Sequence, residues 1–328
     1  MPQPIREARG IPINRFVIKA LILLVAGPLL AGCGASVRDV LIPTQATAPG
    51  TSEVELLVAT TRSAKGAEAG EMFTGERAHS LSFADIAVSL PPDAQRKIGD
   101  VQWPAQLPAD PARDFVTTKA DALGLPMATA RLHALLAKTQ GRRVLVFVHG
   151  YNNRFDEAVY HFAQIAHDSR AAAVPLLFTW PSRGKLLAYT YDRESATYSR
   201  NALEDILQTL ARDPQVGEIS ILAHSMGNWV AIEALRQMSI RNRGLPKKIA
   251  AVMLAAPDVD VDVFQTEIAD IKAPSTNFSL FVSQDDRALA ASRHFWEMSR
   301  VSAPSTPTPS PIASCWRAKA SRCSTSPS

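Results

Sequence analysis

The sequence predicts an α/β protein with a mainly parallel, doubly wound sheet that carries helices on both faces. Two observations support this. From residue 142 onward, apolar strand-like runs alternate with segments of helical periodicity, an order that produces a parallel sheet covered by helices. In addition, "RRVLVFVHG" (142–150) and "IAAVMLAA" (249–256) are apolar almost throughout, as expected of strands buried on both faces.

Each element follows from its own pattern of apolar residues. Before residue 142, two segments alternate like half-buried strands (53–62 and 84–92), and 127–138 has the spacing of a helix. The expected strands after that point are 142–150, 174–180, 218–223, 249–256 and 278–282. Helical stripes cover 155–166, 202–210 and 230–238. Asn153 precedes the first of these stripes and can cap that helix.

The N-terminal segment has the pattern of a secretion signal. A basic stretch ends at Lys19, and an uncharged apolar run (20–31) follows that is too short to span a bilayer comfortably. The run ends in Leu-Ala-Gly-Cys, which resembles the lipobox of bacterial lipoproteins. The resemblance implies that Cys33 is acylated and anchors the chain to the membrane, on the periplasmic side of the outer membrane. Two or three acyl chains give stable attachment, whereas one is marginal.

The chain is accordingly divided into four parts. Residues 1–32 are a lipoprotein signal peptide, 33–53 a polar tether, 54–296 the α/β domain and 297–328 an aberrant tail. The tail is rich in Ser and Pro, has no acidic residue after Glu297 and shows no periodicity. It begins where the fold still needs a last strand and helix. We therefore expect it to be either translated out of frame or disordered, with those two elements missing.

The charge distribution argues against a nucleic-acid-binding surface. The net charge of +4 is misleading, because the first 33 residues carry +3 and residues 300–328 carry +4. The body between them is therefore slightly acidic, at −3, and lacks the basic surface that nucleic acids require. The spacing of the histidines and cysteines suggests no metal site.

The stretch "ILAHSMGNWV" (221–230) places Ser225 between a predicted strand and an amphipathic helix. This is the arrangement of a nucleophile elbow, where small residues two before and two after the serine let strand and helix pass each other. Here those residues are Ala223 and Gly227. Ser225 is therefore the candidate nucleophile.

A serine nucleophile also needs amide donors for the oxyanion. One would be the N–H of Met226, directly after the serine at the start of a helix. The other would be the N–H of Tyr151 in "HGYNN" (149–153), which also follows a buried strand. Because open α/β sheets place ligands at the carboxyl ends of their strands, the two motifs should meet there.

A family resemblance rests on several of these motifs. "VLVFVHGYNNRFDEAVYHFAQI", "FTWPSRG", "LAHSMGNWV", "LAAPDVD" and "FVSQDDRALAAS" resemble the α/β-hydrolases of the uncharacterised esterase/lipase-like family DUF900, over roughly residues 55–296. The resemblance implies a serine hydrolase fold without an established substrate. It also favours Asp286, before "RAL", as the triad acid, with Asp285, Asp258 and Asp260 as alternatives.

The general base has no satisfactory candidate. In this fold the histidine comes last in the chain, after the acid and one more strand, and only His294 follows Asp286. His294 belongs to a segment expected to be the helix directly after the acid, so we expect it to be packed or solvent-facing. His224 adjoins the nucleophile and should point away from the active face, and His149 ends the oxyanion strand. The catalytic histidine is expected to be missing.

The sequence therefore predicts a lipid-anchored serine hydrolase of the esterase/lipase type that acts on a small-molecule or lipid ester and needs no cofactor. Loss of the histidine should leave this chain nearly inactive, since an unassisted serine hydroxyl is a poor nucleophile. The alternative is a non-catalytic envelope lipoprotein that uses a hydrolase scaffold for binding or assembly.

Overall fold

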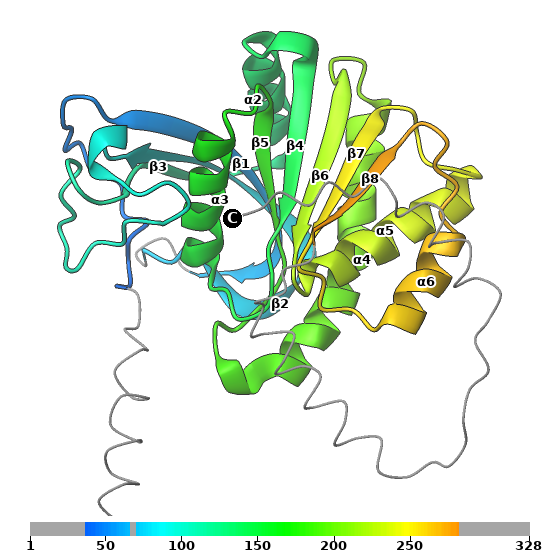
Figure 1. Ribbon diagram of the computed structural model, residues 1–328. Helices are drawn as coiled ribbons and strands as arrows, with labels where there is room; N and C mark the ends of the chain where they lie inside the picture. The colour runs from blue at the N-terminus through cyan, green and yellow to red at the C-terminus, as the bar shows by residue number, and fades with distance from the viewer. Residues whose placement is uncertain (1–36, 66–69, 282–328) are drawn as a thin grey trace, which may run out of the picture. The chain divides into compact units, whose positions relative to one another are not determined.

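The computed structural model describes residues 37–65 and 70–281, which form an eight-stranded sheet in the order β3-β2-β1-β5-β4-β6-β7-β8 (Figure 1). The pairs β1–β2 and β2–β3 are antiparallel, and all the other neighbouring pairs are parallel. The predicted mainly parallel sheet is thus confirmed. The strands are β1 Ser52–Ala64, β2 Phe73–Leu90, β3 Val116–Leu123, β4 Arg143–Val148, β5 Val174–Thr179, β6 Glu218–His224, β7 Ile249–Ala255 and β8 Asn277–Phe281.

Helices cover both faces of this sheet, so that β4 is buried on each side. Val144, Val146 and Val148 belong to one hydrophobic cluster, with α2, α4 and α5. Leu145 and Phe147 belong to a second cluster, with α3. This two-sided burial explains why the strand has no polar alternation. The helices are α2 Leu125–Ala137, α3 Phe155–Ser169, α4 Tyr189–Arg212, α5 Gly227–Asn242 and α6 Val261–Ala269, with short 3-10 turns at Asp93–Gln95, Gln140–Arg142 and Leu186–Ala188.

The strand order reverses next to β4. The chain moves from β4 to β5 on one side and then crosses to β6 on the other side of β4. Open α/β sheets hold their ligands at such a switch point, outside the carboxyl ends of the strands. The segments that leave β4 and β6 contain "HGYNN" and Ser225, so the fold brings the two predicted motifs to this point.

Several elements differ from the sequence prediction. The antiparallel strand β3 and the helix α6 were not expected, and α4 begins at Tyr189, well before the apolar stripe at 202–210. The helix after β4 starts at Phe155, and Asn153 does not cap it. Instead, the Asn153 amide donates to the carbonyl of Tyr151 at 2.9 Å and stabilises the preceding loop.

The segment before β1 packs against the domain from residue 40 onward. Val40 and Leu41 are buried, and the Val40 carbonyl accepts hydrogen bonds from Thr117 (2.9 Å) and Tyr160 (3.0 Å). These residues lie within the stretch 33–53 that the sequence suggested as a tether. Only residues 33–39 of that stretch precede the packed residues.

Several predictions concern residues that the structure does not describe. The acylated Cys33, the acid candidates Asp285 and Asp286, His294 and the aberrant tail all lie outside the described residues. Strand β8 forms one edge of the described sheet, and all five of its residues are exposed. In the described ranges, no helix combines the length and apolarity needed to cross a bilayer.

Candidate active site

Ser225 occupies a sharp turn between β6 and α5, as the elbow motif predicts. Its φ of 51° lies in the left-handed region, which costs an L-residue about 1–2 kcal/mol. The Ser225 N–H donates to the carbonyl of Ala255 at the end of β7 (3.0 Å). The side chain is half-buried, and among the described residues its hydroxyl makes no hydrogen bond. The hydroxyl is thus held on a strained turn, and no described residue fixes its orientation.

Two glycines allow this turn to approach the end of β4. A Cβ on Gly227 would lie 2.4 Å from the carbonyl oxygen of His149 and 2.5 Å from that of Val148. A Cβ on Gly150 would lie 2.9 Å from Cβ of Ser225. All three distances are too short for a side chain at either glycine, so the start of α5 lies against the backbone at the end of β4, and Gly150 lies against Ser225. The glycines in "HSMG" and "HG" therefore serve the same contact from its two sides.

Asn228 ties the elbow to the neighbouring strand. Its side chain is fully buried, and its amide donates to the carbonyls of Ser225 (2.8 Å) and Ala255 (2.9 Å). The N–H of Asp258 also donates to the Ser225 carbonyl (3.3 Å). The sequence analysis did not single out Asn228, although an amide side chain three residues after the candidate nucleophile was a signal that it could have used.

The two expected oxyanion donors lie on either side of this contact. Met226 directly follows the nucleophile and precedes α5, and Tyr151 follows Gly150 in the opposing loop. Within the described parts of the chain, neither backbone N–H donates a hydrogen bond. Two unengaged amides beside a serine hydroxyl are the components of an oxyanion hole.

His149 supports the β4–α3 loop and is not placed to act as a base. Its ring is buried and stacked on Trp180, with ring centroids 4.9 Å apart. Nδ1 donates to the carbonyl of Gly150 (2.8 Å), and Nε2 accepts from the Trp180 N–H (3.2 Å) and lies 2.9 Å from the Thr179 hydroxyl. Burial and the nearby charge of Arg62 hold the pKa of His149 well below its usual value. A neutral, fully bonded ring fixes the loop and cannot reach a substrate.

A fully buried arginine links the same loop to β1. Arg62 donates to the Asn153 carbonyl (2.8 Å), the Ser182 carbonyl (2.8 Å) and the Thr179 hydroxyl (2.8 Å). Burial lowers its pKa to about 10, and the carboxylate of Asp192 is the largest influence that opposes this shift. This role was not predicted, because Arg62 is simply the last residue of the expected alternating strand 53–62, which the structure extends to Ala64.

Asp192 is the acidic counterpart of this arginine. It is fully buried near the start of α4 and accepts from the Ser182 hydroxyl (2.5 Å) and from the backbone N–H groups of Arg183 (3.0 Å) and Asn152 (3.4 Å). Burial raises its pKa, although these hydrogen bonds oppose that shift. Asp192 thereby joins the β5–α4 loop to the loop that carries Tyr151.

Of the acid candidates, the structure describes Asp258 and Asp260. Asp260 caps α6, since its carboxylate accepts from the N–H groups of Asp262 (2.9 Å) and Val263 (3.3 Å). Asp258 is half-buried beside the elbow and accepts from the hydroxyl of Tyr189 (3.2 Å), whose pKa is raised by burial and by that carboxylate. Asp258 therefore lies at the site, whereas Asp260 stabilises a helix end.

Among the described histidines, none hydrogen-bonds to Ser225. His224 is exposed, and its Nδ1 would lie 2.9 Å from a Cβ on Gly150, so the ring packs against the loop after β4. His133 pairs with Asp213 at 2.7 Å, and Asp213 precedes the start of β6, whereas the elbow follows its end. The described residues also contain no cluster of three or more His, Cys, Asp or Glu side chains that could hold a metal ion.

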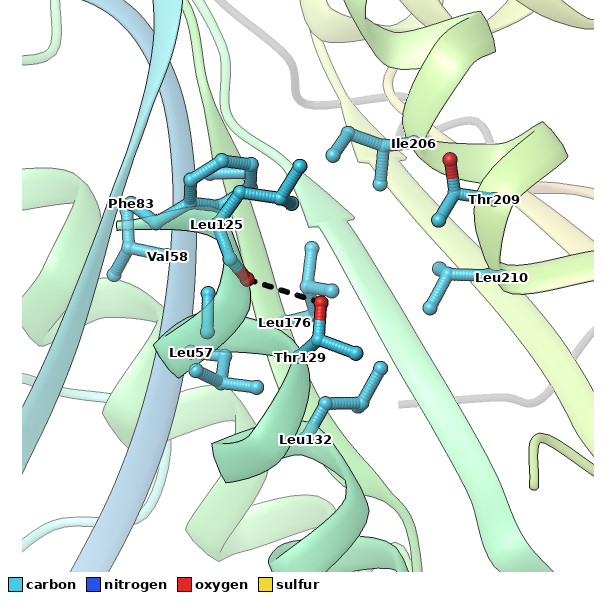
Figure 2. A pocket seen from close by; sticks show the side chains of 12 residues that line it. Leu57, Val58, Phe83, Leu125, Thr129, Leu132, Leu176, Ile206, Thr209 and Leu210 are labelled. Atoms are coloured by element: carbon cyan, nitrogen blue, oxygen red, sulfur yellow. Dashed lines mark hydrogen bonds between the residues drawn. The ribbon is translucent and has the colours of Figure 1, made fainter. Parts of the chain in front are cut away.

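An apolar crevice lies elsewhere on the sheet, between α2 and α4 (Figure 2). Its volume is about 60 Å³, and its lining includes no residue of the elbow or of the β4–α3 loop. The hydroxyls of Thr129 and Thr209 bond to carbonyls of their own helices (3.0 and 2.8 Å), which leaves the lining almost entirely apolar. The crevice is therefore separate from the candidate catalytic residues.

Comparison with known proteins agrees with this geometry. Residues 127–314 match the family model described as alpha/beta hydrolase of unknown function (DUF900). The chain belongs to this family. The predicted DUF900 resemblance is therefore confirmed, and with it the α/β-hydrolase fold.

One relative is a protein of Nostoc sp. (strain PCC 7120 / SAG 25.82 / UTEX 2576) that is named only as uncharacterized protein alr1448. It is 27% identical over 128 residues, which cover 31% of this chain and 33% of the relative. The chain thus spans about a third of the length of that relative. No solved structure matches the chain significantly.

Proposed function

We propose that this DUF900 protein is a serine hydrolase of carboxylic esters, with Ser225 as the nucleophile and the N–H groups of Tyr151 and Met226 as the oxyanion hole. The observation that carries the proposal is the strained turn at Ser225 packed closely against Gly150, beside two amides that are unengaged in the described chain. In the reaction, the Ser225 hydroxyl would lose its proton to a base or to water as its oxygen attacks the ester carbonyl, whose oxygen would take up negative charge between the two amides. Return of that charge to the carbonyl would expel the alcohol, which takes up a proton, and water would then hydrolyse the acyl-serine to the acid and regenerate Ser225.

The buried groups beneath the site would keep this geometry in place. Arg62 and Asp192 fix the loop that carries Tyr151, and Asn228 fixes the turn that carries Ser225. We propose Asp286 as the acid that orients a base, with Asp285 and Asp258 as alternatives; only Asp258 lies in the described chain. The proposal that this chain has low activity rests on the sequence, in which His294 is the one histidine after Asp286 and was not expected to act as the base.

The cellular setting is also part of the proposal. Acylation of Cys33 would anchor the protein in the bacterial envelope, on the periplasmic side of the outer membrane, with access to small-molecule or lipid esters. The apolar run that ends in Leu-Ala-Gly-Cys supports this setting.

Hydrolysis of p-nitrophenyl butyrate tests the chemistry. We expect slow release of p-nitrophenol that Ser225→Ala reduces to the background rate, while Ser220→Ala, in the middle of β6, leaves it unchanged. Equal rates for both variants and the parent protein, whether above background or at it, would favour the non-catalytic scaffold.

A further inference from the structure

We infer that this protein binds a lipid membrane through the carboxyl edge of its sheet, with Leu186 and Leu187 as the main contacts. The inference goes beyond the hydrolase proposal, and one of its arguments rests on the proposed acylation of Cys33. Its first observation is exposure. In the loop between β5 and α4, Leu187 is 102% exposed and Leu186 is 66% exposed. Figure 1 shows this loop as the green segment that leads into α4 at the foot of the view.

The loop is held so that these side chains stay outside. The Tyr151 hydroxyl donates to the Leu186 carbonyl, and Asp192 binds the N–H of Arg183 at 3.0 Å. The leucines open a short 3-10 turn, Leu186–Ala188, which follows the anchored Arg183 and leads into α4. Two adjacent leucines held in water form a small exposed apolar patch, and a membrane interface accommodates such side chains.

The charges beside the leucines fit an anionic lipid surface. Lys185 is exposed and immediately precedes Leu186, and the exposed Arg183 lies two residues before it. Cations beside apolar side chains are attracted to anionic headgroups while the apolar groups enter the acyl boundary. Exposed acidic residues lie on both sides of the site: Glu76 and Glu194 near the leucine loop, and Asp262 at the start of α6. Because Glu76 already pairs with Arg183, the cation that remains for a headgroup is Lys185, which makes no ion pair among the described residues. The exposed leucines together with Lys185 therefore point to the β5–α4 side as the one that meets the lipid.

The first described residues, from Val37 onward, lie at the same edge. Because β1 is parallel to its neighbour β5, the hairpin from β1 to β2 projects from the carboxyl edge. Arg38 is 3.8 Å from Glu71 of this hairpin, and a Cβ on Gly70 would lie 2.7 Å from Cα of Asp39. Through Glu76, the hairpin also binds Arg183 of the leucine loop (3.0 Å).

The proposed anchor cannot be far from this edge. Cys33 is four residues before Val37, where the described chain begins. Four residues extend over at most ~14 Å. A lipid attached at Cys33 would therefore hold the hairpin, and with it the leucine loop, close to the membrane surface. Chain entry, exposed leucines and the candidate active site would all face the same lipid.

An environment-sensitive fluorophore tests which face contacts the lipid. In the full-length protein with Cys315→Ser and Cys323→Ser, the dye NBD would be attached through Leu187→Cys or, as the control, Ile98→Cys. Ile98 is 74% exposed and lies near Asp168, whose carboxylate binds the N–H of Gly99 at the far end of α3. An acylated Cys33 does not react with the label. If mass spectrometry shows Cys33 unmodified, Cys33→Ser is added.

With vesicles of phosphatidylethanolamine and phosphatidylglycerol, we expect a several-fold, blue-shifted rise in fluorescence at position 187 and none at position 98. A rise at position 98 alone, equal rises at both, or no rise at 187 would overturn the inference. The mass of the N-terminal peptide reports acylation separately, and no step of the assay depends on hydrolysis. Failure of the proposed chemistry can thus be distinguished from failure of the membrane face.

Discussion

The strained backbone at Ser225 predicts that glycine at this position stabilises the protein relative to alanine. Both Ser225→Gly and Ser225→Ala remove the hydroxyl, so the comparison isolates the backbone. With φ at 51°, alanine keeps a strain of about 1–2 kcal/mol that glycine lacks. Glycine also loses about 0.5–1 kcal/mol through its greater freedom in the unfolded chain.

The net expectation is that S225G is about 1 kcal/mol more stable than S225A. The free energy of unfolding from urea titrations measures this difference directly, and the midpoint of thermal unfolding should rise by about 2–4 °C for a domain of this size. Ser220 provides the control, because it lies in the extended strand β6. There, Ser220→Gly should be less stable than Ser220→Ala by about 0.5–1 kcal/mol.

The opposite signs at the two positions are the essential result. If S225G proves no more stable than S225A, while the pair at Ser220 behaves as expected, then Ser225 does not occupy the left-handed turn in solution. The elbow, and the position of the nucleophile with it, would then be wrong.

Three further predictions concern the groups that hold the site. Gly227→Ala should lower the free energy of unfolding by about 3 kcal/mol, because the added Cβ would press on two backbone carbonyls. As its control, Gly124→Ala should change the midpoint of urea unfolding little, since its Cβ would have no neighbour nearer than 3.9 Å. Asp192→Asn should lower the free energy of unfolding, measured by calorimetry, by about 3 kcal/mol, because an acceptor oxygen is replaced and Arg62 loses the nearby negative charge. The exposed Asp205→Asn should show no such loss. Because the folded pKa of His149 is lowered, the unfolded state binds more protons below pH ~6.5. Stability is then full above that pH and falls below it, by up to about 1.4 kcal/mol per pH unit. His149→Gln should show a shallower decline in urea titrations between pH 7 and 5, and an unchanged slope would contradict the buried neutral ring.

The parts of the fold that could be predicted are those whose burial or backbone geometry follows from the residues of one short segment. The apolar run of β4 requires burial on both faces, and α3 and α5 provide it. The elbow was predictable for a similar reason, since Gly227 is needed wherever a helix start passes a strand end this closely. In contrast, the first half of α4 packs through small residues such as Ser195, Ala196 and Ser199, which produce no apolar stripe.

The supporting residues of the site could not be predicted because their partners are distant in the chain. Arg62 and Asp192 act on the 149–153 loop from β1 and from α4, about 90 and 40 residues away in sequence. Within its own segment, each looks like an ordinary surface charge. Only the strand order, which places β1, β5 and β4 side by side, reveals that they are buried under the same loop.

The most direct test of the proposed catalytic arrangement is a crystal structure of the protein after long exposure to a p-nitrophenyl alkylphosphonate. The expected result is a single adduct on the oxygen of residue 225, with the phosphoryl oxygen about 2.7–3.1 Å from the amide nitrogens of residues 151 and 226. An adduct whose phosphoryl oxygen points away from both amides, or modification at other serines with residue 225 untouched, would contradict the account.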